Sequence, residues 1–406
     1  MAAAALAAAM MTALCAGCGH PVALLSAPDG PPAHPHCGGP VLTLGAPQLL
    51  RAYGLPAMLA AGINGAGTTI ATILPGANPW VAHDLAVYSS RSGLPSARLR
   101  IISYGHVPPA THSGEAAHWA KEGIEDVEMM HTFAPGAALI YVEVLDPGGL
   151  LLYDQALSWV VAHLRPDVVS YSSGTPEFKG VAQWQAGLQA AARAGVTVLA
   201  ATGDTGATEP VGTTLWPTPV ALWPASDPLV TAVGGTWLHV DAAGRRVRPD
   251  TVFSDVGGSV AGGAGLSAVF PRPAWRDSVR ATVGGHRGIA DVSMDGSECS
   301  PGAVFQQAVA PGGWGRTQGT SMATAMFAGL AADAAQVAGH RLGLLGPALY
   351  SLHGTADGLL DVTQGTDSMP GMPGWPTRPG YDLPTGIGTV AAALPFITAL
   401  ARAVPK

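Results

Sequence analysis

The chain has 406 residues, of which 48% are hydrophobic and 12% are charged, so it can bury a large core and is too apolar to be disordered. Its net charge is −7 and its Lys and Arg residues are scattered, which argues against nucleic acid as a partner. The 54 glycines and 35 prolines indicate tight turns and long structured loops, which are common in extracellular enzymes.

Residues 1–18 are almost wholly small and apolar. The stretch has the length of a signal-peptide core and is short for a membrane-spanning helix. The first basic residue is Arg51, so the usual positive start of an export signal is missing. Two interpretations stay open. One is an Ala-rich signal peptide of a secreted protein, and the other is a lipoprotein leader in which Cys18 carries a lipid anchor.

Residues 19–41 are rich in Pro, Gly and His, which predicts a linker before a domain that spans 42–406. If the leader is removed or lipidated, Cys37 and Cys299 are the cysteines left in the body of the chain. They could form one disulfide in an oxidising compartment, but their spacing alone does not show that they meet.

From about Leu42, short β-branched runs alternate with helix-like stretches. The predicted strands are Thr68–Leu74, Arg100–Ser103, Ala138–Val144, Asp167–Ser170 and Thr197–Ala201, and the predicted helices are Trp80–Arg91, Gly114–Phe133, Gln155–His163 and Phe178–Ala194. This alternation predicts an α/β fold, a doubly wound and mainly parallel sheet with helices on both faces. Active sites of such sheets lie at the carboxyl ends of the strands. A Gly-rich segment then leads to a final Ala-rich helix that begins at Ser321.

Ser321 is a candidate nucleophile. The segment 318–325 reads Gln-Gly-Thr-Ser-Met-Ala-Thr-Ala and runs into an apolar helix, where backbone N–H groups and the helix dipole favour a developing negative charge. A serine that merely caps the helix explains the same pattern. Because a serine hydroxyl is a poor nucleophile until a base takes its proton, the interpretation depends on finding that base.

Two carboxylates on the predicted helix Gly114–Phe133 are candidates for this base. Glu122 and Asp126 are four residues apart and therefore share one face, which continues through Met129 and Phe133. A different face, which we expect to meet solvent, carries Lys121, Glu125, Glu128 and Thr132. The alignment with apolar residues favours a buried functional pair, but a solvated pair of acidic side chains stays open.

Asp204 follows the predicted strand Thr197–Ala201 in the run Thr-Gly-Asp-Thr-Gly. A turn aspartate that bonds its own backbone is the ordinary interpretation of such a run. Asp361 and Asp382, near the end of the chain, also read as turn aspartates when taken alone.

Taken together and in this order, the motifs resemble the sedolisin (serine-carboxyl peptidase) family of the subtilisin-like clan. The likeness rests on Gly-Thr-Ser-x-Ala before a helix, on Glu-x-x-x-Asp followed by Ala-Pro-Gly-Ala at 134–137, and on Gly-Asp-x-Gly at the strand end. Further similar segments lie at 223–236, 262–267, 270–275 and 290–293, so that the likeness covers about 42–394.

The resemblance implies a subtilisin-like fold and a monomeric serine-type endopeptidase that acts on polypeptides. By this resemblance, Ser321 is the nucleophile, Glu122 the general base and Asp126 the residue that orients it. Asp204 would be protonated and would stabilise the oxyanion. A glutamate base with an ordinary pKa near ~4.3 implies activity at roughly pH 3–5.

The resemblance also implies one structural calcium ion. Its ligands would be Asp361, Asp382 and the main-chain carbonyls of Val362, Arg378 and Gly380, a set of oxygens of the kind that calcium prefers.

The chain departs from the family pattern at Gln318, at Ala325 and at 172–174, which read Ser-Ser-Gly instead of a Trp-Gly segment. The family's large N-terminal pro-domain has no counterpart, so we expect 42–406 to be a catalytic domain without one. A non-catalytic binding or scaffold homologue therefore remains an alternative. A subtilisin-like Ser/His/Asp peptidase is weaker, because no aspartate follows the first strand and the motif at His353 comes after Ser321.

Overall fold

The computed structural model describes residues 33–34, 37, 39–107, 114–144, 149–211, 214–254, 260–307 and 312–405. The predicted leader 1–18, with Cys18, and most of the predicted linker lie outside the described residues. Among the described residues, none of the helices is both long enough and apolar enough to cross a membrane.

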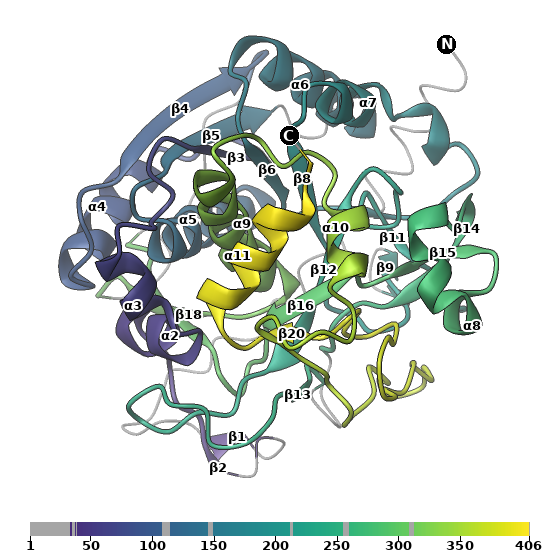
Figure 1. Ribbon diagram of the computed structural model, residues 1–406. Helices are drawn as coiled ribbons and strands as arrows, with labels where there is room; N and C mark the ends of the chain where they lie inside the picture. The colour runs from purple at the N-terminus through teal and green to yellow at the C-terminus, as the bar shows by residue number, and fades with distance from the viewer. Residues whose placement is uncertain are drawn as a thin grey trace.

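A ten-stranded sheet forms the centre of the molecule (Figure 1). Its strands follow the order β19-β20-β16-β12-β8-β6-β3-β5-β4, and β13 pairs with β12 off this path. Their bounds are β3 Thr69–Pro75, β4 Arg98–Tyr104, β5 Ala138–Val144, β6 Val168–Tyr171, β8 Thr197–Ala201, β12 Thr231–Trp237, β13 Thr251–Val252, β16 Val292–Asp295, β19 Leu359–Leu360 and β20 Thr389–Val390. The pairs from β4 to β20 are parallel, whereas β13 and β19 pair antiparallel.

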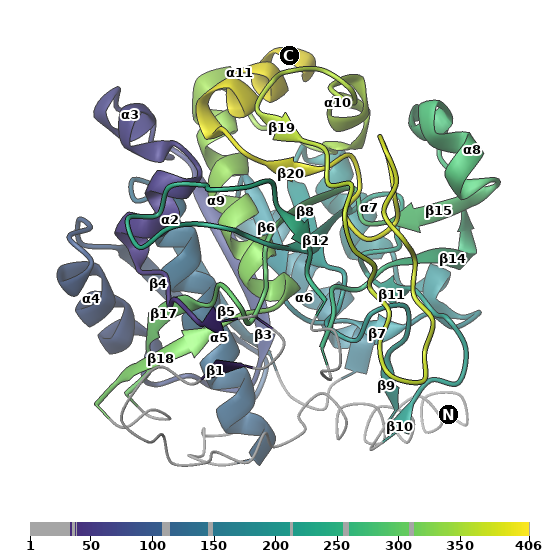
Figure 2. The same ribbon diagram turned by 90° about the horizontal axis from the view of Figure 1, so that it is seen from below.

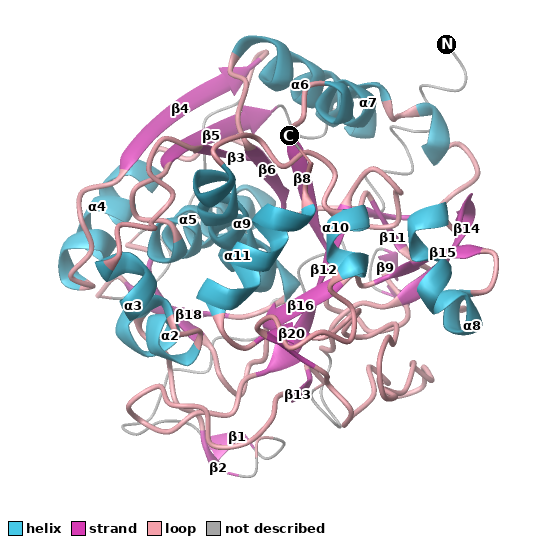
Figure 3. Cartoon of the chain, viewed as in Figure 1, coloured by secondary structure: helices cyan, strands magenta, loops and turns pink. Residues whose placement is uncertain are grey.

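Helices cover both faces of this sheet, as Figure 3 shows by the cyan coils on either side of the magenta strands. One face packs against α2 (Ala46–Ala52), α3 (Leu55–Ala60), α4 (Val81–Arg91), α5 (Gly114–Phe133), α9 (Thr320–Ala338), α10 (Gly346–Ser351) and α11 (Ala393–Ala403). The other face packs against α6 (Gly149–His163) and α7 (Ala186–Arg193). Parallel strands buried on both faces are typical of α/β folds, and the predicted fold class is confirmed.

Two glycines allow α5 to pack closely against its neighbours. A Cβ atom on Gly123 would lie 2.1 Å from the hydroxyl of Tyr141 on β5, and one on Gly329 of α9 would lie 2.5 Å from Cβ of Phe133. Any larger residue would push α5 away from the sheet or from α9. Because Glu122 and Ser321 lie on these two helices, this packing sets the distance between them.

Most predicted elements are present, and three of them (β5, α5 and β8) have the predicted bounds. The predicted helix Phe178–Ala194 is wrong in its first half, where the chain forms the short 3₁₀ turn Val181–Gln183 and α7 begins only at Ala186. Trp184 leaves the helical conformation, and its ring packs edge-on against Phe178 at 5.3 Å. Tertiary packing of this kind overrides a local helical pattern.

The helix that begins the nucleophile segment also differs in detail from the prediction. It begins at Thr320, one residue before Ser321, and it is not the final helix, because α10 and α11 follow it. Figure 2 shows the long segment between β19 and β20 looping past β11 (Leu222–Trp223) and β9 (Pro210–Val211). This segment reaches Gly206, whose added Cβ would lie 2.3 Å from the carbonyl oxygen of Asp367.

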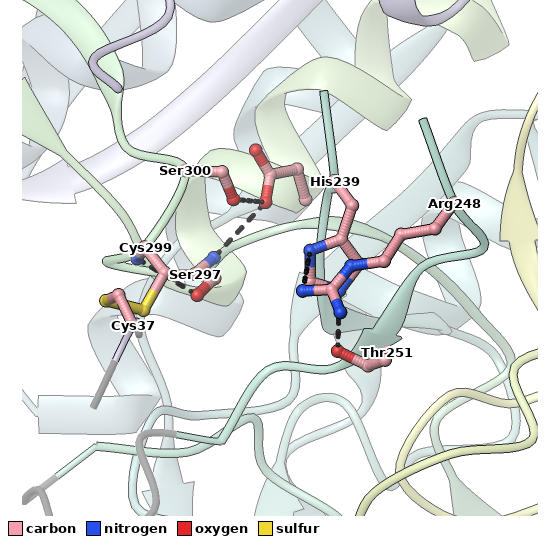
Figure 4. The surroundings of a disulfide bond; sticks show 8 residues. Cys37, His239, Arg248, Thr251, Ser297, Cys299 and Ser300 are labelled. Carbon is pink, nitrogen blue, oxygen red and sulfur yellow. Dashed lines mark hydrogen bonds between the residues drawn. A yellow bond between two sulfur atoms is a disulfide. The ribbon is translucent and has the colours of Figure 1, made fainter. Parts of the chain in front are cut away.

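A disulfide joins Cys37 to Cys299, with 5.4 Å between their Cα atoms (Figure 4). Cys37 lies between two short paired strands, β1 (Ala33–His34) and β2 (Gly39–Pro40), and Cys299 lies in the loop after β16. In that loop the backbone N–H of Cys299 donates to the hydroxyl of Ser297 across 3.1 Å. The two cysteines that the sequence left as an open pairing therefore meet.

Candidate active site

Ser321 is the second residue of α9 and follows the capping glycine, Gly319, by two positions. The cap, Gly319, has a φ of +107°, and an added Cβ would lie 2.5 Å from Oδ2 of Asp204. Residues with a side chain rarely adopt such a φ. Glycine is therefore required here both by the backbone conformation and by the closeness of Asp204 to the backbone. The side chain of Ser321 therefore lies beside the first N–H groups of a helix, where negative charge is favoured.

The Glu122 carboxyl, on α5, lies beside the Ser321 side chain. Burial raises its pKa, whereas the Ser321 side chain, acting as a hydrogen-bond donor, and the charge of Lys121 lower it. Its Oε1 atom is buried and has no hydrogen-bond partner among the described residues. A buried carboxylate with a free acceptor next to a serine hydroxyl has the arrangement that a general base needs.

Asp126 is fully buried one turn further along α5, and two hydroxyls hold it. Thr72 on β3 donates to Oδ2 across 2.6 Å, and Ser172, directly after β6, donates to Oδ1 across 2.7 Å. Burial and the negative charge of Glu122 raise the pKa of Asp126 to about 8. The two carboxyls thus titrate as one pair.

Asp204 lies just after β8 and contacts the nucleophile loop. The backbone N–H of Thr320 donates to its Oδ1 across 2.7 Å, and the Thr320 hydroxyl lies 3.0 Å from the same oxygen. Burial, together with the charge of Glu122, raises the pKa of Asp204 to about 6. Because Oδ1 accepts from Thr320, the proton of the neutral acid belongs on Oδ2, the oxygen that lies against Gly319.

The fold therefore brings together all four residues that the sequence singled out: Ser321, Glu122, Asp126 and Asp204. They come from α9, α5 and the loop after β8, elements that are far apart in the sequence and adjacent in space (Figure 1). The charge of Glu122 acts on both aspartates, which indicates one electrostatic unit and not three separate sites.

The prediction that one face of α5 meets solvent is wrong. Glu125, Glu128 and Thr132 have exposed fractions of 3%, 0% and 0%. A hairpin of β17 (Gly302–Phe305) and β18 (Trp314–Thr317) covers this face, and the backbone N–H of Phe305 donates to Oε2 of Glu128 across 2.9 Å. The helix is buried almost all round, so its charged residues did not mark a solvent face.

Three residues that sequence reasoning did not assign to the site contact it: Thr72, Ser172 and Thr320. Thr72 had a usable signal, because it is a hydroxyl residue within the apolar run Ile-Ala-Thr-Ile of a buried strand. A buried hydroxyl requires a hydrogen-bond partner, and the partner here is Asp126.

The histidines do not supply a base for Ser321 in any contact that the described residues make. His83 bonds Asp84 across 2.9 Å, and His131 contacts the carbonyl of Pro95 across 2.8 Å. His353 lies against Gly380, with Nε2 3.4 Å from an added Cβ on that glycine. After β3, Asn78 stands where a carboxylate would be needed, and its backbone N–H donates to Glu143 across 2.8 Å.

The candidate calcium ligands lie in the segment around β19 and β20. Asp361 Oδ2 accepts the N–H of Gly380 across 2.9 Å, and Asp382 Oδ1 accepts the N–H of Thr385 across 2.9 Å. Burial is the largest cause that raises the pKa of Asp382 to about 6, and the charge of Asp361 adds to it. The fold thus brings the two predicted aspartates together. No cluster of three or more His, Cys, Asp or Glu side chains suited to a metal occurs in the described part of the chain.

Comparisons with known proteins show to which family the chain belongs. The model of the subtilase family, Peptidase_S8, matches residues 110–343. Kumamolisin of Bacillus sp. (strain MN-32) is 31% identical over 369 residues, which cover 86% of this chain and 63% of kumamolisin. Sedolisin of Pseudomonas sp. (strain 101) is 28% identical over 350 residues, which cover 81% of this chain and 57% of sedolisin. The chain thus spans about three fifths of the length of these relatives.

Solved structures give the same result. Pseudomonas sedolisin, described as a serine-carboxyl proteinase in complex with pseudo-iodotyrostatin, superposes with a TM-score of 0.77 at 25% identity and covers 87% of this chain and 97% of its own. A lanthipeptide protease shares the fold alone, with a TM-score of 0.50 at 14% identity. The chain has the fold of a subtilisin-like peptidase. It belongs to the sedolisin–kumamolisin family within the subtilase clan.

Proposed function

We propose that the protein is a serine endopeptidase that hydrolyses polypeptides at acidic pH through Ser321, Glu122 and Asp126, with Asp204 as the oxyanion residue. The observation that carries the proposal is the half-buried Glu122, whose carboxyl lies beside the hydroxyl of Ser321 at the start of a helix. The family relationship supports a peptidase, since its named relatives include kumamolisin, sedolisin and tripeptidyl-peptidase 1.

In the first half of the reaction, Ser321 Oγ attacks the carbonyl carbon of the scissile bond while its proton moves to Glu122. The carbonyl oxygen becomes an oxyanion, which receives hydrogen bonds from the protonated Oδ2 of Asp204 and from the N–H of Ser321. The intermediate collapses when the C–N bond breaks and Glu122 gives its proton to the leaving amine. Ser321 then carries the acyl group as an ester.

In the second half, water attacks this ester and transfers a proton to Glu122. The tetrahedral intermediate that results is stabilised by the same two donors. It collapses when the bond to Ser321 Oγ breaks and Glu122 returns the proton to that oxygen. The products are a peptide with a free amine and a peptide with a free carboxyl, and the enzyme returns to its starting state.

The two carboxyl roles set opposite pH limits. Glu122 must be ionised to accept a proton, so activity rises as pH increases through the pKa of the Glu122–Asp126 pair. Asp204 must be neutral to donate, so activity falls as pH increases through about 6. Activity is therefore confined to an acidic window, and a histidine base would not give this pattern.

We also propose that one structural calcium ion binds Asp361, Asp382 and the carbonyls of Val362, Arg378 and Gly380. The fit rests on the closeness of the two carboxyls, since the charge of Asp361 is one cause that raises the pKa of Asp382, and on the backbone of Arg378 and Gly380, which contacts these carboxyls. When bound, the cation would offset the repulsion between the two aspartates and would hold the ends of the long loop together.

We propose that 42–406 is the catalytic domain, and that the protein acts outside the cell, as the disulfide supports. The leader 1–18 is then either a signal peptide or a lipoprotein leader with the anchor at Cys18, and we propose a monomer. The net charge of −7 and the scattered Lys and Arg residues argue against a nucleic-acid partner.

The test is cleavage of a denatured protein across pH 2–9 by the wild type and by Ser321→Ala. We expect cleavage by the wild type in acid only, and none by the variant. Absence of cleavage by the purified wild type at every pH would favour the scaffold alternative. A neutral optimum would instead favour a subtilisin-like mechanism.

A further inference from the structure

Two buried hydroxyls donate hydrogen bonds to Asp126, one to each oxygen of its carboxyl group. Thr72 Oγ1 lies 2.6 Å from Oδ2 and Ser172 Oγ lies 2.7 Å from Oδ1. Distances of ~2.5–2.7 Å are typical of a hydroxyl that donates to a charged oxygen. Thr72 is 1% exposed and Ser172 is 9% exposed, so water is largely kept from these contacts.

Both hydroxyls come from two neighbouring strands of the central sheet, β3 and the end of β6. Thr72 lies in the middle of β3, and Ser172 directly follows β6, which is the parallel neighbour of β3 in the sheet. In the register of these strands Thr72 pairs with Ser170, two residues before Ser172. The sheet thus fixes the two donors relative to each other, and α5 presents Asp126 to both.

We propose that Thr72 and Ser172 are positioning residues of the catalytic pair, which orient Asp126 and stabilise the single negative charge that Asp126 and Glu122 share. This inference rests on the proposed peptidase function. The two hydroxyls act on the substrate only through Asp126 and Glu122. Nothing in the serine and glutamate motifs of the sequence requires them.

The charged and titratable groups around the pair make such stabilisation necessary. The neighbouring acidic groups are Glu122 and Glu125 on α5 and Asp204 after β8. The charge of Asp126 also raises the pKa of Tyr141 on β5. Lys121 is the one cation among the groups that act on Glu122. Burial raises the pKa of Asp126, and the hydrogen bonds from Thr72 and Ser172 lower it.

Both hydroxyls donate to Asp126, so they act on the ionisation of the pair through the share of the negative charge that Asp126 carries. The hydroxyls stabilise the singly charged pair, so their removal makes the first ionisation of the pair harder. The acidic limb of the pH–rate profile should then move to higher pH. The loss of one hydrogen bond to a charged group corresponds to a shift of about one pH unit, or about tenfold in rate at a pH on that limb.

The test compares matched pairs of variants. Thr72→Val removes the hydroxyl and keeps the shape, whereas Thr72→Ser keeps the hydroxyl. Ser172→Ala removes the second donor, and Ser173→Ala removes the half-buried serine next to it, which makes no described contact with Asp126. The readouts are kcat/KM for a peptide substrate from pH 2.5 to 7, and the melting temperature at pH 3 and pH 6.

We expect the acidic limb to move up by about one pH unit in Thr72→Val and in Ser172→Ala, and to stay in place in Thr72→Ser and in Ser173→Ala. Acidic limbs that coincide in all four variants would overturn the inference. Equal losses of activity in Thr72→Val and Thr72→Ser without a shift would overturn it as well, because they would indicate a purely structural role.

A wild type without peptidase activity would reject the proposed function, and the melting temperatures would still test the contacts themselves. Because the hydroxyl stabilises the charged pair, the deficit of Thr72→Val relative to Thr72→Ser should be larger at pH 6 than at pH 3. An equal deficit at both values would reject the stabilisation of charge by Thr72.

Discussion

The backbone N–H of Thr320 donates to Oδ1 of Asp204 across 2.7 Å, which ties the proposed oxyanion acid to the residue that precedes the nucleophile. This contact holds Asp204 against the start of the helix that carries Ser321. The contact also assigns roles to the two oxygens of Asp204. Oδ1 accepts from the protein, and in the proposed mechanism Oδ2 donates to the substrate.

Asp204→Asn should change the shape of the pH–rate profile. An amide donates a hydrogen bond at every pH, whereas Asp204 loses its proton as pH rises through about 6. We expect Asp204→Asn to be slower than the wild type at its optimum but to lose the fall in kcat/KM near pH 6. Asp204→Ala, as the matched control, should lose about 10²–10³-fold in kcat. A fall near pH 6 that persists in Asp204→Asn would assign that limb to another group.

Glu125→Gln should make the protein more stable towards neutral pH. Burial, the charge of Glu122 and the charge of Asp126 raise the pKa of Glu125 well above its usual value. A raised pKa gives stability that is complete below the unfolded pKa, near ~4.3, and that is lost as pH rises towards the folded pKa. The free energy of unfolding of the wild type should therefore fall more steeply, by up to about 1.4 kcal/mol per pH unit, than that of Glu125→Gln.

Urea unfolding at pH 4.5, 6 and 7.5 measures this difference. Asp357→Asn, which removes one carboxyl from a half-exposed loop position, is the control for the change in net charge. Stability curves that run parallel for the wild type and Glu125→Gln would show that Glu125 does not titrate in this range.

The burial of Glu125 also shows which part of the structure could not be predicted from the sequence, namely the exposed or buried state of the charged face of α5. Charged residues at 121, 125 and 128 predicted a solvent face, because an isolated helix exposes its charged side. The hairpin of β17 and β18, which is contributed by residues about 180 positions later in the chain, covers that side. The local sequence pattern of α5 cannot predict a contact with residues so far along the chain.

Other parts were predictable for physical reasons. The bounds of β5, α5 and β8 follow from apolar periodicity between strong stop signals such as Gly195, and the spacing of Glu122 and Asp126 places them on one face of a helix. The hydroxyls of Thr72 and Ser172 were not predictable in the same way. Their role depends on which helix covers the sheet above them.

Removal of calcium should destabilise the wild type through its C-terminal loop. We expect a chelator to lower the melting temperature by several degrees at pH 7 and to have little effect on Asp361→Ala, which lacks a proposed ligand. The pKa of Asp382 is raised to about 6, so its protonation at lower pH should weaken binding and reduce the chelator's effect. Elemental analysis of the purified wild type should find about one calcium per chain, and a calcium-free wild type would reject the site.

Reduction of the Cys37–Cys299 disulfide should lower stability and loosen the nucleophile loop. The loop that carries Cys299 begins at Gly296, whose carbonyl accepts the N–H of Gly319 across 2.7 Å. We expect a phosphine reductant at pH 5 to cost about 2–5 kcal/mol of unfolding free energy. Cys299→Ser should show this loss without reductant and no further change with it. A wild type that is unaffected by full reduction would contradict the expectation.

The central claim is that Glu122, and not a histidine, activates Ser321. It is tested most directly by kcat/KM for one peptide substrate from pH 2 to pH 9, measured for the wild type and for Glu122→Gln. The amide keeps the shape of the side chain but cannot accept the proton of Ser321 as a base. We expect a bell-shaped wild-type profile that lies below about pH 6 and a loss of at least about 10³-fold at the optimum in Glu122→Gln. A wild type with a neutral optimum, whose rate is unchanged by Glu122→Gln, would contradict the claim.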